Sequence, residues 1–243
     1  MKHLKTIMSV MAILAAVSCA KTTVVSNGQV TFGISSDQMV IDKTKSNVSD
    51  YTSLPVSGDF TMSIKDAENT QIWTGKVSEW NAETQLKAGA YTVTATYGAV
   101  EDEGFDKPYF TGDASFTVTG GQTATVSIPV TLGNTIVKIS CTDDFMNYYK
   151  DYNFRFTRDG MDIVTFAKGD DRGAFIDGYK FTLEGTLTSE TKTHTFSKEY
   201  AGLDAATAYT FVFDASNVGS TSITISFNDK VETVDLGDYE LND

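Results

Sequence analysis

Five carboxylates stand close together in the stretch TATYGAVEDEGFDKPYFTGDASF, which spans residues 94–116. They are Glu101, Asp102, Glu103, Asp106 and Asp113, with glycines and a proline among them. Such a loop could hold a cation, and two carboxylates at a defined separation could serve a hydrolase as acid and base. Consecutive side chains diverge in an extended chain, however, so this run is not arranged to converge on one ion. The pattern favours the solvated connection between two strands.

Other catalytic or metal-binding chemistry is sparse. Beyond the N-terminal segment the only histidine is His194, which alternates with its neighbours in TKTHTFSK as a strand surface would. One histidine and one cysteine in the body of the chain argue against a zinc site. The segment KGDDRGAFIDG does not have the spacing of an EF-hand loop, and no nucleophile-elbow, phosphate-loop or dinucleotide-binding pattern occurs. We therefore predict no catalytic residues, no metal, no cofactor and no enzymatic activity.

Aromatic side chains are the better candidates for binding. Trp80 lies among polar residues in KVSEWNAE, and Tyr109 and Phe110 end the acidic loop. An exposed flat ring can stack on a sugar or on a protein partner. The alternative is that each ring covers the end of the fold. The predicted partner-binding residues are Trp80, Phe105, Asp106, Tyr109 and Phe110.

Strict two-residue alternation of apolar and polar side chains runs through the chain. It is clearest in FTMSIK, YTVTATY and ATVSIPV, and it predicts strands with one buried and one wet face, hence antiparallel sheets. The alternation breaks at PVTLGN and resumes afterwards. We therefore predict an all-β protein of two tandem antiparallel β-sandwiches, Ig-like or transthyretin-like, at residues 28–131 and 132–243. No convincing amphipathic helix is present, although FMNYYKDY is compatible with a turn or two.

A weak internal echo supports two related units. LKAGAYTVTA and LDAATAYTFVF share a leucine, a turn of small residues and a tyrosine that opens a strand, Tyr91 or Tyr209. At such a corner of a Greek-key sandwich, the hydroxyl of a tyrosine forms a hydrogen bond with nearby backbone.

The N-terminus reads as an export signal. Two lysines precede an apolar run that ends in Val17-Ser18-Cys19, and the run is too short to span a bilayer. The arrangement predicts a lipoprotein signal peptide at residues 1–18, lipidation of Cys19 and a tether at residues 19–27. An ordinary secretory signal is the alternative. Cys141 alternates with apolar residues in IVKISC, which predicts a small buried side chain.

The charge balance restricts the partners. The formal net charge is −13 over 243 residues, and no block of like charges exceeds three residues. An acidic surface repels phosphate backbones and anionic lipid headgroups. We therefore expect no nucleic-acid partner, and contact with the membrane only through the lipid on Cys19.

Several segments resemble a family of Bacteroidales lipoproteins known only as a domain of unknown function. They are DFTMSIKDAENTQIW, LKAGAYTVTATYG, GFDKPYFTGDASFTV and ITISFNDKVET. The family is similar in layout to fimbrillin-type and adhesion-associated β-sandwich lipoproteins. The resemblance implies an envelope protein with no known catalytic residues. We expect the protein to lie on the cell surface. Surface-exported lipoproteins of these bacteria often carry acidic residues soon after the cysteine, and CAKTTVV has none. Attachment that faces the periplasm is therefore the alternative.

Together these features predict a non-catalytic, lipid-anchored outer-membrane protein that acts in adhesion or in fimbria-like surface assembly. The alternative is a glycan-binding surface lipoprotein for nutrient capture, with Trp80 or Tyr109 as the platform. The partner, a protein or a glycan, is left unidentified by the sequence.

Overall fold

The computed structural model describes residues 26–37, 46–215, 222–227 and 230–235. The predicted signal peptide, Cys19 and most of the predicted tether lie outside the described residues. Within the described residues, no helix is both long enough and apolar enough to cross a bilayer.

The N-terminal sandwich is built around a ladder with the strand order β3-β2-β5-β7-β8-β1-β4. Its strands are β1 (Asn27–Ser36), β2 (Thr61–Asp66), β3 (Gln71–Lys76), β4 (Leu86–Lys87), β5 (Gly89–Tyr97), β7 (Phe110–Val118) and β8 (Thr123–Leu132). β7 pairs with β8 only at Phe110↔Leu132 and Thr111↔Thr131. At these residues the hydrogen bonding passes from one sheet of the sandwich, β3-β2-β5-β7, to the other, β8-β1-β4. Apolar side chains of both halves then share one core. Three short 3-10 helices lie in the connections, at Val48–Asp50, Ser57–Asp59 and Val77–Glu79.

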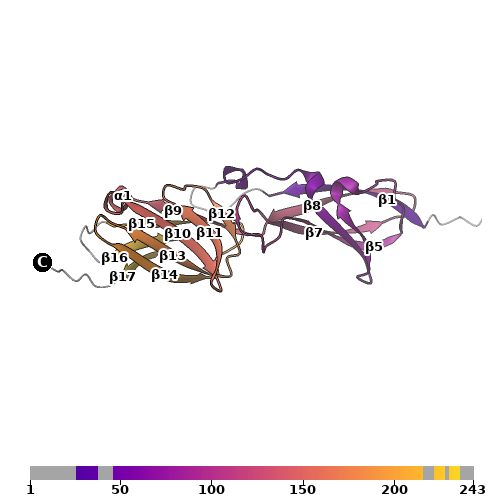
Figure 1. The fold of residues 1–243 in the computed structure, drawn as a ribbon. Helices are drawn as coiled ribbons and strands as arrows, with labels where there is room; N and C mark the ends of the chain where they lie inside the picture. The colour runs from indigo at the N-terminus through magenta and orange to yellow at the C-terminus, as the bar shows by residue number, and fades with distance from the viewer. Residues whose placement is uncertain (1–25, 38–45, 216–221, 228–229, 236–243) are drawn as a thin grey trace, which may run out of the picture.

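The C-terminal sandwich packs a four-stranded sheet, β11-β10-β13-β14, against the sheet β17-β16-β15-β9-β12-β6. Its own strands are β9 (Thr135–Cys141), β10 (Asp151–Arg158), β11 (Met161–Ala167), β12 (Ala174–Ile176), β13 (Lys180–Thr188), β14 (Thr193–Ala201), β15 (Ala208–Asp214), β16 (Ser222–Phe227) and β17 (Lys230–Asp235). The last strand of the second sheet, β6 (Gly104–Phe105), comes from the other half of the chain. The two sandwiches lie end to end, with β1 in one and β17 in the other (Figure 1).

The helix α1 (Asp143–Tyr148) is the turn or two expected from FMNYYKDY. Thr142 caps its first turn, because its Oγ1 accepts a hydrogen bond from the backbone N–H of Phe145 at 3.2 Å. The Phe145 side chain is fully buried in the C-terminal core.

Both sandwiches have the same connectivity. In the first, β3-β2-β5-β7 faces β8-β1-β4; in the second, β11-β10-β13-β14 faces β15-β9-β12 in the same chain order. Each unit also pairs its first strand in parallel with a later one: β1 with β8, and β9 with β15. The prediction of an all-β fold of packed sheets is confirmed, whereas the expectation of purely antiparallel pairing is wrong. Side-chain alternation reports which face of a strand is wet and carries no information on its direction.

The repeat differs from the one that the sequence echo suggests. Tyr91 lies in β5, whereas Tyr209 lies in β15, the counterpart of β8. Both tyrosines nevertheless form the expected corner. The Tyr91 hydroxyl donates to the carbonyl of Lys87 at 2.9 Å, and the Tyr209 hydroxyl accepts from the N–H of Asp204 at 3.2 Å. The shared motif therefore marks similar local turns in non-equivalent strands.

Candidate functional site

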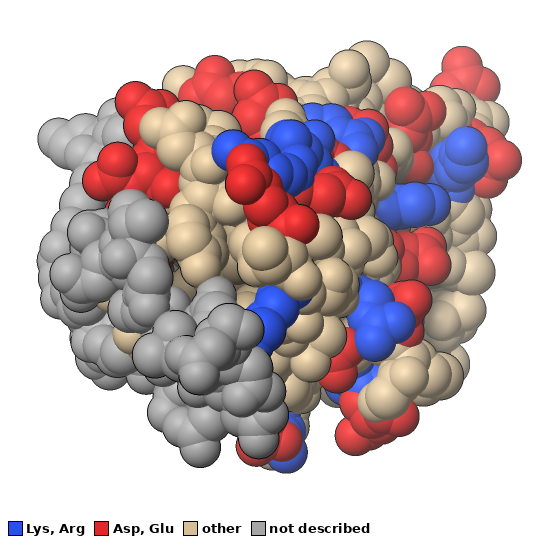
Figure 2. Space-filling model, turned by 60° about the vertical axis from the view of Figure 1, so that its left-hand side comes forward, with Lys and Arg blue, Asp and Glu red and all other residues tan. Residues whose placement is uncertain are grey.

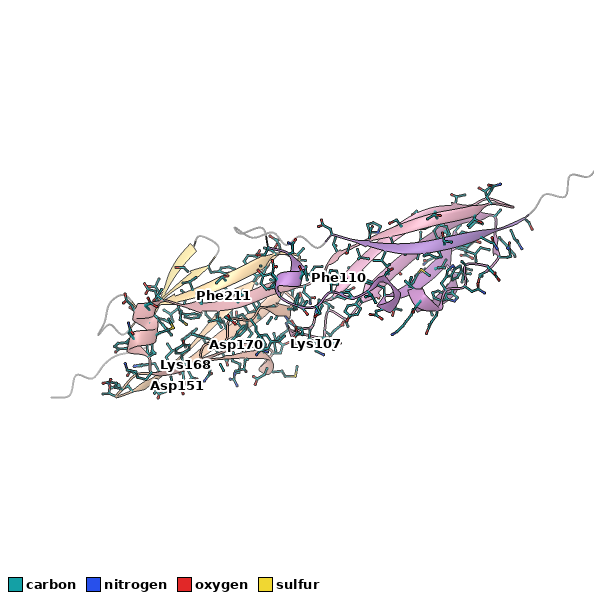
Figure 3. All side chains as sticks on the ribbon, turned by 90° about the horizontal axis from the view of Figure 1, so that it is seen from above. Lys107, Phe110, Asp151, Lys168, Asp170 and Phe211 are labelled. Atoms are coloured by element: carbon teal, nitrogen blue, oxygen red, sulfur yellow. The ribbon has the colours of Figure 1, made fainter. Side chains whose placement is uncertain are left out.

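The acidic loop between β5 and β7 forms the junction of the two sandwiches. Its residues Gly104 and Phe105 make up β6, which pairs with β12 in the register Phe175↔Gly104 and Ala174↔Phe105. Gly104 is buried and has φ +126°, a conformation that side chains rarely adopt. A loop of the first sandwich thus supplies the edge strand of a sheet in the second. Figure 3 shows Lys107 and Phe110, which follow this strand, where the two bodies meet.

Glu103 is the electrostatic centre of the junction. Its Oε2 accepts from Nη1 of Arg158, and its Oε1 accepts from the backbone N–H of Asp177 at 2.6 Å. The Arg158 guanidinium also donates to the carbonyls of Asp177 and Lys180, at 2.7 and 2.9 Å. The Glu103 side chain is 10% exposed and that of Arg158 is 28% exposed. The expectation of a wholly solvated loop is therefore wrong at this residue, because a partner from the other sandwich replaces water.

Phe105 faces the second sandwich. Its ring meets that of Phe166 edge to face at a centroid distance of 5.0 Å, and the Arg172 guanidinium carbon lies 3.7 Å from its centroid. The cation–π contact with Arg172 and the edge-to-face contact with Phe166 both hold Phe105 against the second sandwich. Asp106 is exposed, with a left-handed φ of 56°, and its Oδ1 accepts from the Thr52 hydroxyl at 3.1 Å.

Tyr109 and Phe110 end the junction loop. The Tyr109 N–H donates to Oδ1 of the fully buried Asn134, and its carbonyl accepts from the Gly133 N–H at 2.7 Å. Gly133 has to be small, because a Cβ there would lie 2.6 Å from the Tyr109 ring. Phe110 is 1% exposed and belongs to the N-terminal core, so its ring covers the fold, as the alternative to an exposed binding ring predicts. Its place in the alternation of β7 carries the ring inward.

Trp80 follows the 3-10 helix Val77–Glu79 and is half-buried. Its indole Nε1 donates to the carbonyl of Val30 at 2.8 Å, and its ring meets Phe32 and Trp73 edge to face at 5.3 and 5.2 Å. The ring therefore covers β1, which is the alternative that the sequence left open. The structure brings Phe105, Asp106, Tyr109 and Phe110 into one loop and leaves Trp80 on the body of the first sandwich.

The titratable groups carry little sign of catalysis. Among the described residues, no three His, Cys, Asp or Glu side chains are grouped so that they could hold a metal ion. Burial raises the pKa of the Cys141 thiol to about 12, against an opposing effect of the hydrogen bond with Tyr152. The hydrogen bond from Arg172 is the main cause that lowers the pKa of Asp170. On the face that Figure 2 displays, Lys and Arg stand among Asp and Glu rather than in a continuous basic patch.

The C-terminal sandwich also has a surface hollow that no sequence motif indicates. A hollow of about 850 Å³ lies over the outer face of β11-β10-β13-β14, between side chains that include Asn153, Arg155, Glu184 and Thr186. In the sequence these residues are only the polar half of ordinary alternation. Their grouping depends on the register of four strands, which no local pattern encodes.

Comparison with known proteins places the chain in a family. A family described as a domain of unknown function, DUF4493, has a sequence model that matches residues 26–237. The chain belongs to this family. The match takes in both sandwiches and the junction loop of the DUF4493 chain. No curated protein matches it.

Solved structures share its fold at low identity. A fimbrial assembly protein from Parabacteroides distasonis has a TM-score of 0.50 and 7% identity, over 86% of this chain and 99% of that one. The fimbrial anchor protein Mfa2 from Porphyromonas gingivalis has a TM-score of 0.44 and 10% identity, over 84% of this chain and 98% of that one. The first of these likenesses supports the all-β fold.

Proposed function

We propose that this DUF4493 protein is a non-catalytic, lipid-anchored protein of the outer envelope that acts in adhesion or surface assembly. The observation that supports the proposal is that the two end-to-end sandwiches are joined by the pairing of β6 with β12 and by the ion pair of Glu103 with Arg158. Such a pair is a stiff spacer, because an ion pair, a strand pairing and an aromatic contact all cross the junction. A stiff spacer suits a protein that must present a surface away from its point of attachment.

The order of the parts gives the proposed molecule a direction. The tether precedes β1, and β1 lies in the N-terminal sandwich (Figure 1). With a lipid on Cys19, the N-terminal sandwich is the membrane-proximal unit and the C-terminal sandwich is presented outward. The names of the similar structures, a fimbrial assembly protein and a fimbrial anchor protein, support a role of this kind.

Lipidation is tested by replacing Cys19. We expect Cys19→Ala to move the protein from the membrane fraction to the soluble fraction, and we expect mass spectrometry to find a lipid on Cys19 of the unaltered protein. Surface labelling of intact cells then distinguishes outward from periplasmic attachment. Unchanged membrane partition of the variant, together with an unmodified cysteine, would contradict the anchor.

The adhesive role needs a partner, which crosslinking in intact cells can capture. We expect a defined envelope or fimbrial protein to be recovered with the full chain and lost with a variant that opens the junction, Glu103→Ala combined with Phe105→Ala. If the same partner protein is recovered equally with both proteins, the contacts at the junction of the two sandwiches have no part in binding.

Glycan binding for nutrient capture is the second candidate. The packed Trp80 ring offers no open platform for it, but the hollow over the four-stranded sheet does favour it.

A further inference from the structure

The hollow over the C-terminal sandwich has a floor of two polar rows that cross the sheet. The first row joins Asn153 on β10, Thr186 on β13 and Thr195 on β14, which are directly opposite one another in the strand register. Ala167 on β11 continues it beyond Asn153. Because side chains on one face recur every second residue, all four point away from the core.

The second row lies two residues further along each strand. It joins Thr165, Arg155, Glu184 and Ser197 through the same registers. Arg155 is fixed in place, since its Nη2 lies 2.6 Å from Glu184 and its Nη1 lies 3.3 Å from Asp162. This ion-paired group is taller than its threonine, serine and alanine neighbours. It therefore forms a wall beside a floor of short side chains.

The floor side chains are not bonded to one another. Within the described part of the chain, the polar groups of Asn153, Thr186, Thr195 and Ser197 make no hydrogen bond to protein. Hydroxyl groups elsewhere do pair across strands: Thr31 with Thr125 at 3.1 Å on β1 and β8, and Thr188 with Thr193 at 3.1 Å at the end of β13 and the start of β14. The rows over the C-terminal sandwich therefore offer hydroxyl and amide groups to an incoming ligand.

The chemistry of the rows selects the ligand. Hydroxyl and amide groups both donate and accept hydrogen bonds, which matches the hydroxyl groups of a sugar. Two carboxylates, Asp162 and Glu184, stand against the single guanidinium of Arg155, so an anionic ligand is repelled. The hollow, of about 850 Å³, is open to solvent and lined mainly by polar side chains, so it suits a polar ligand that stays partly exposed. A neutral oligosaccharide fits these conditions.

We propose that the outer face of β11-β10-β13-β14 binds a neutral oligosaccharide, held by the two rows through Asn153, Thr186, Thr195 and Ser197 and bordered by the Arg155 ion pairs. The inference rests on the proposed surface location, since it places the site on the sandwich that is presented outward. Binding by hydrogen bonds without an exposed aromatic ring is weak at a single site, because each bond replaces one with water. Several copies of the protein on one surface would compensate by multivalency.

The test uses the purified chain made soluble by Cys19→Ser. Isothermal titration with maltohexaose, cellohexaose and xylohexaose, preceded by a glycan array, should give saturable binding to at least one neutral glycan. Sialyllactose and heparin-derived oligosaccharides serve as anionic probes. Binding only to the anionic probes, or to no glycan on the array, would overturn the proposal.

Two substitutions locate the site. Thr186→Leu replaces the hydroxyl in the centre of the first row with a bulkier apolar side chain and should weaken binding by about tenfold or more. Thr94→Leu is the matched control, because Thr94 lies on the exposed face of β5, the topological counterpart of β13. It should leave the affinity unchanged, and equal loss in both variants would contradict the assignment.

Chemical-shift mapping keeps the test independent of whether a variant folds. On titration of the unaltered fold, amide signals of Asn153, Thr186 and Thr195 should move together, while those of Trp80 and its neighbours stay. Shifts confined to Trp80 or Tyr109 would place the site elsewhere. These measurements use soluble protein, so the glycan-binding result does not depend on whether Cys19 carries a lipid. A negative binding result can therefore be distinguished from a negative result of the membrane-fractionation test.

Discussion

The structural role of Glu103, an ion pair with Arg158, is not apparent from its position in the sequence. In the sequence it is the third of three consecutive acids, yet its two neighbours are exposed while its own carboxylate reaches Arg158 of the other sandwich. A partly buried ion pair with further hydrogen bonds gives specificity to a junction, and its loss leaves a charged group without its partner. The same loop therefore holds one structural acid beside several solvated ones.

Glu103→Gln should lower the free energy of unfolding by about 1–3 kcal/mol, because the Arg158 guanidinium loses its charged partner in a partly desolvated place. Urea denaturation followed by circular dichroism measures it. Asp102→Asn, which removes an exposed acid next door, should stay within about 0.5 kcal/mol of the unaltered protein. Equal effects of the two substitutions would mean that the ion pair adds nothing to stability.

Cys141 should be inert while the protein is folded. Burial raises its pKa to about 12, so the reactive thiolate is almost absent at neutral pH. Iodoacetamide at about pH 8 should leave the peptide that contains Cys141 unmodified, and denaturant should allow complete alkylation. Peptide mapping by mass spectrometry distinguishes this cysteine from Cys19. Rapid alkylation of the folded protein would show that the thiol is accessible.

At the scale of elements, the strand β6 decides what the acidic loop does. Two residues paired with β12 are enough to fix the direction of the chain on either side of them. Glu103 is then turned toward Arg158, and Asp106 is turned toward Thr52. Glu103 and Asp106 consequently have different partners, and the acids of the described residues form no group of three that could hold a metal ion.

The loop should therefore not bind calcium as a structural ion. A calcium site of the extracellular type, with a dissociation constant of about 10⁻⁴–10⁻³ M, would stabilise the fold by roughly 1.4–2.7 kcal/mol in ~10 mM calcium. That corresponds to several degrees in melting temperature for a domain of about 100 residues. We expect a shift below about two degrees, from screening of an acidic surface.

Magnesium at equal ionic strength is the control for that experiment. A rise of about five degrees or more with calcium alone, abolished by Asp102→Ala combined with Asp106→Ala, would establish a metal site.

At the scale of the whole molecule, each sandwich has its own hydrophobic core, and the two units repeat one connectivity. The division is not clean, however. β6 belongs by sequence to the first unit and by pairing to the second, and Ile136 and Phe175 of the second pack against the core of the first. The predicted boundary between residues 131 and 132 falls one residue before the end of β8, so it assigns Leu132, which packs in the first core, to the second unit.

Expressed separately, residues 28–131 and 132–243 should both give β-rich circular dichroism. The C-terminal fragment should melt below its transition in the whole chain, because it lacks β6 and leaves Arg158 without Glu103. Adding the N-terminal fragment in excess should recover part of that loss. If neither fragment folds, the two halves form a single cooperative unit.

The sequence by itself determined which faces of the strands are buried, because alternation reports burial directly. It therefore predicted the all-β class and the corner tyrosines, whereas Cys141, expected to be buried, packs against the C-terminal core but is only partly buried. It could not reveal the parallel pairing of β1 with β8, the place of β6 in the other sandwich or the rows of the hollow. Each of these joins residues from distant parts of the chain. Pairing partner and register arise from three-dimensional packing, and only the tertiary structure decides them.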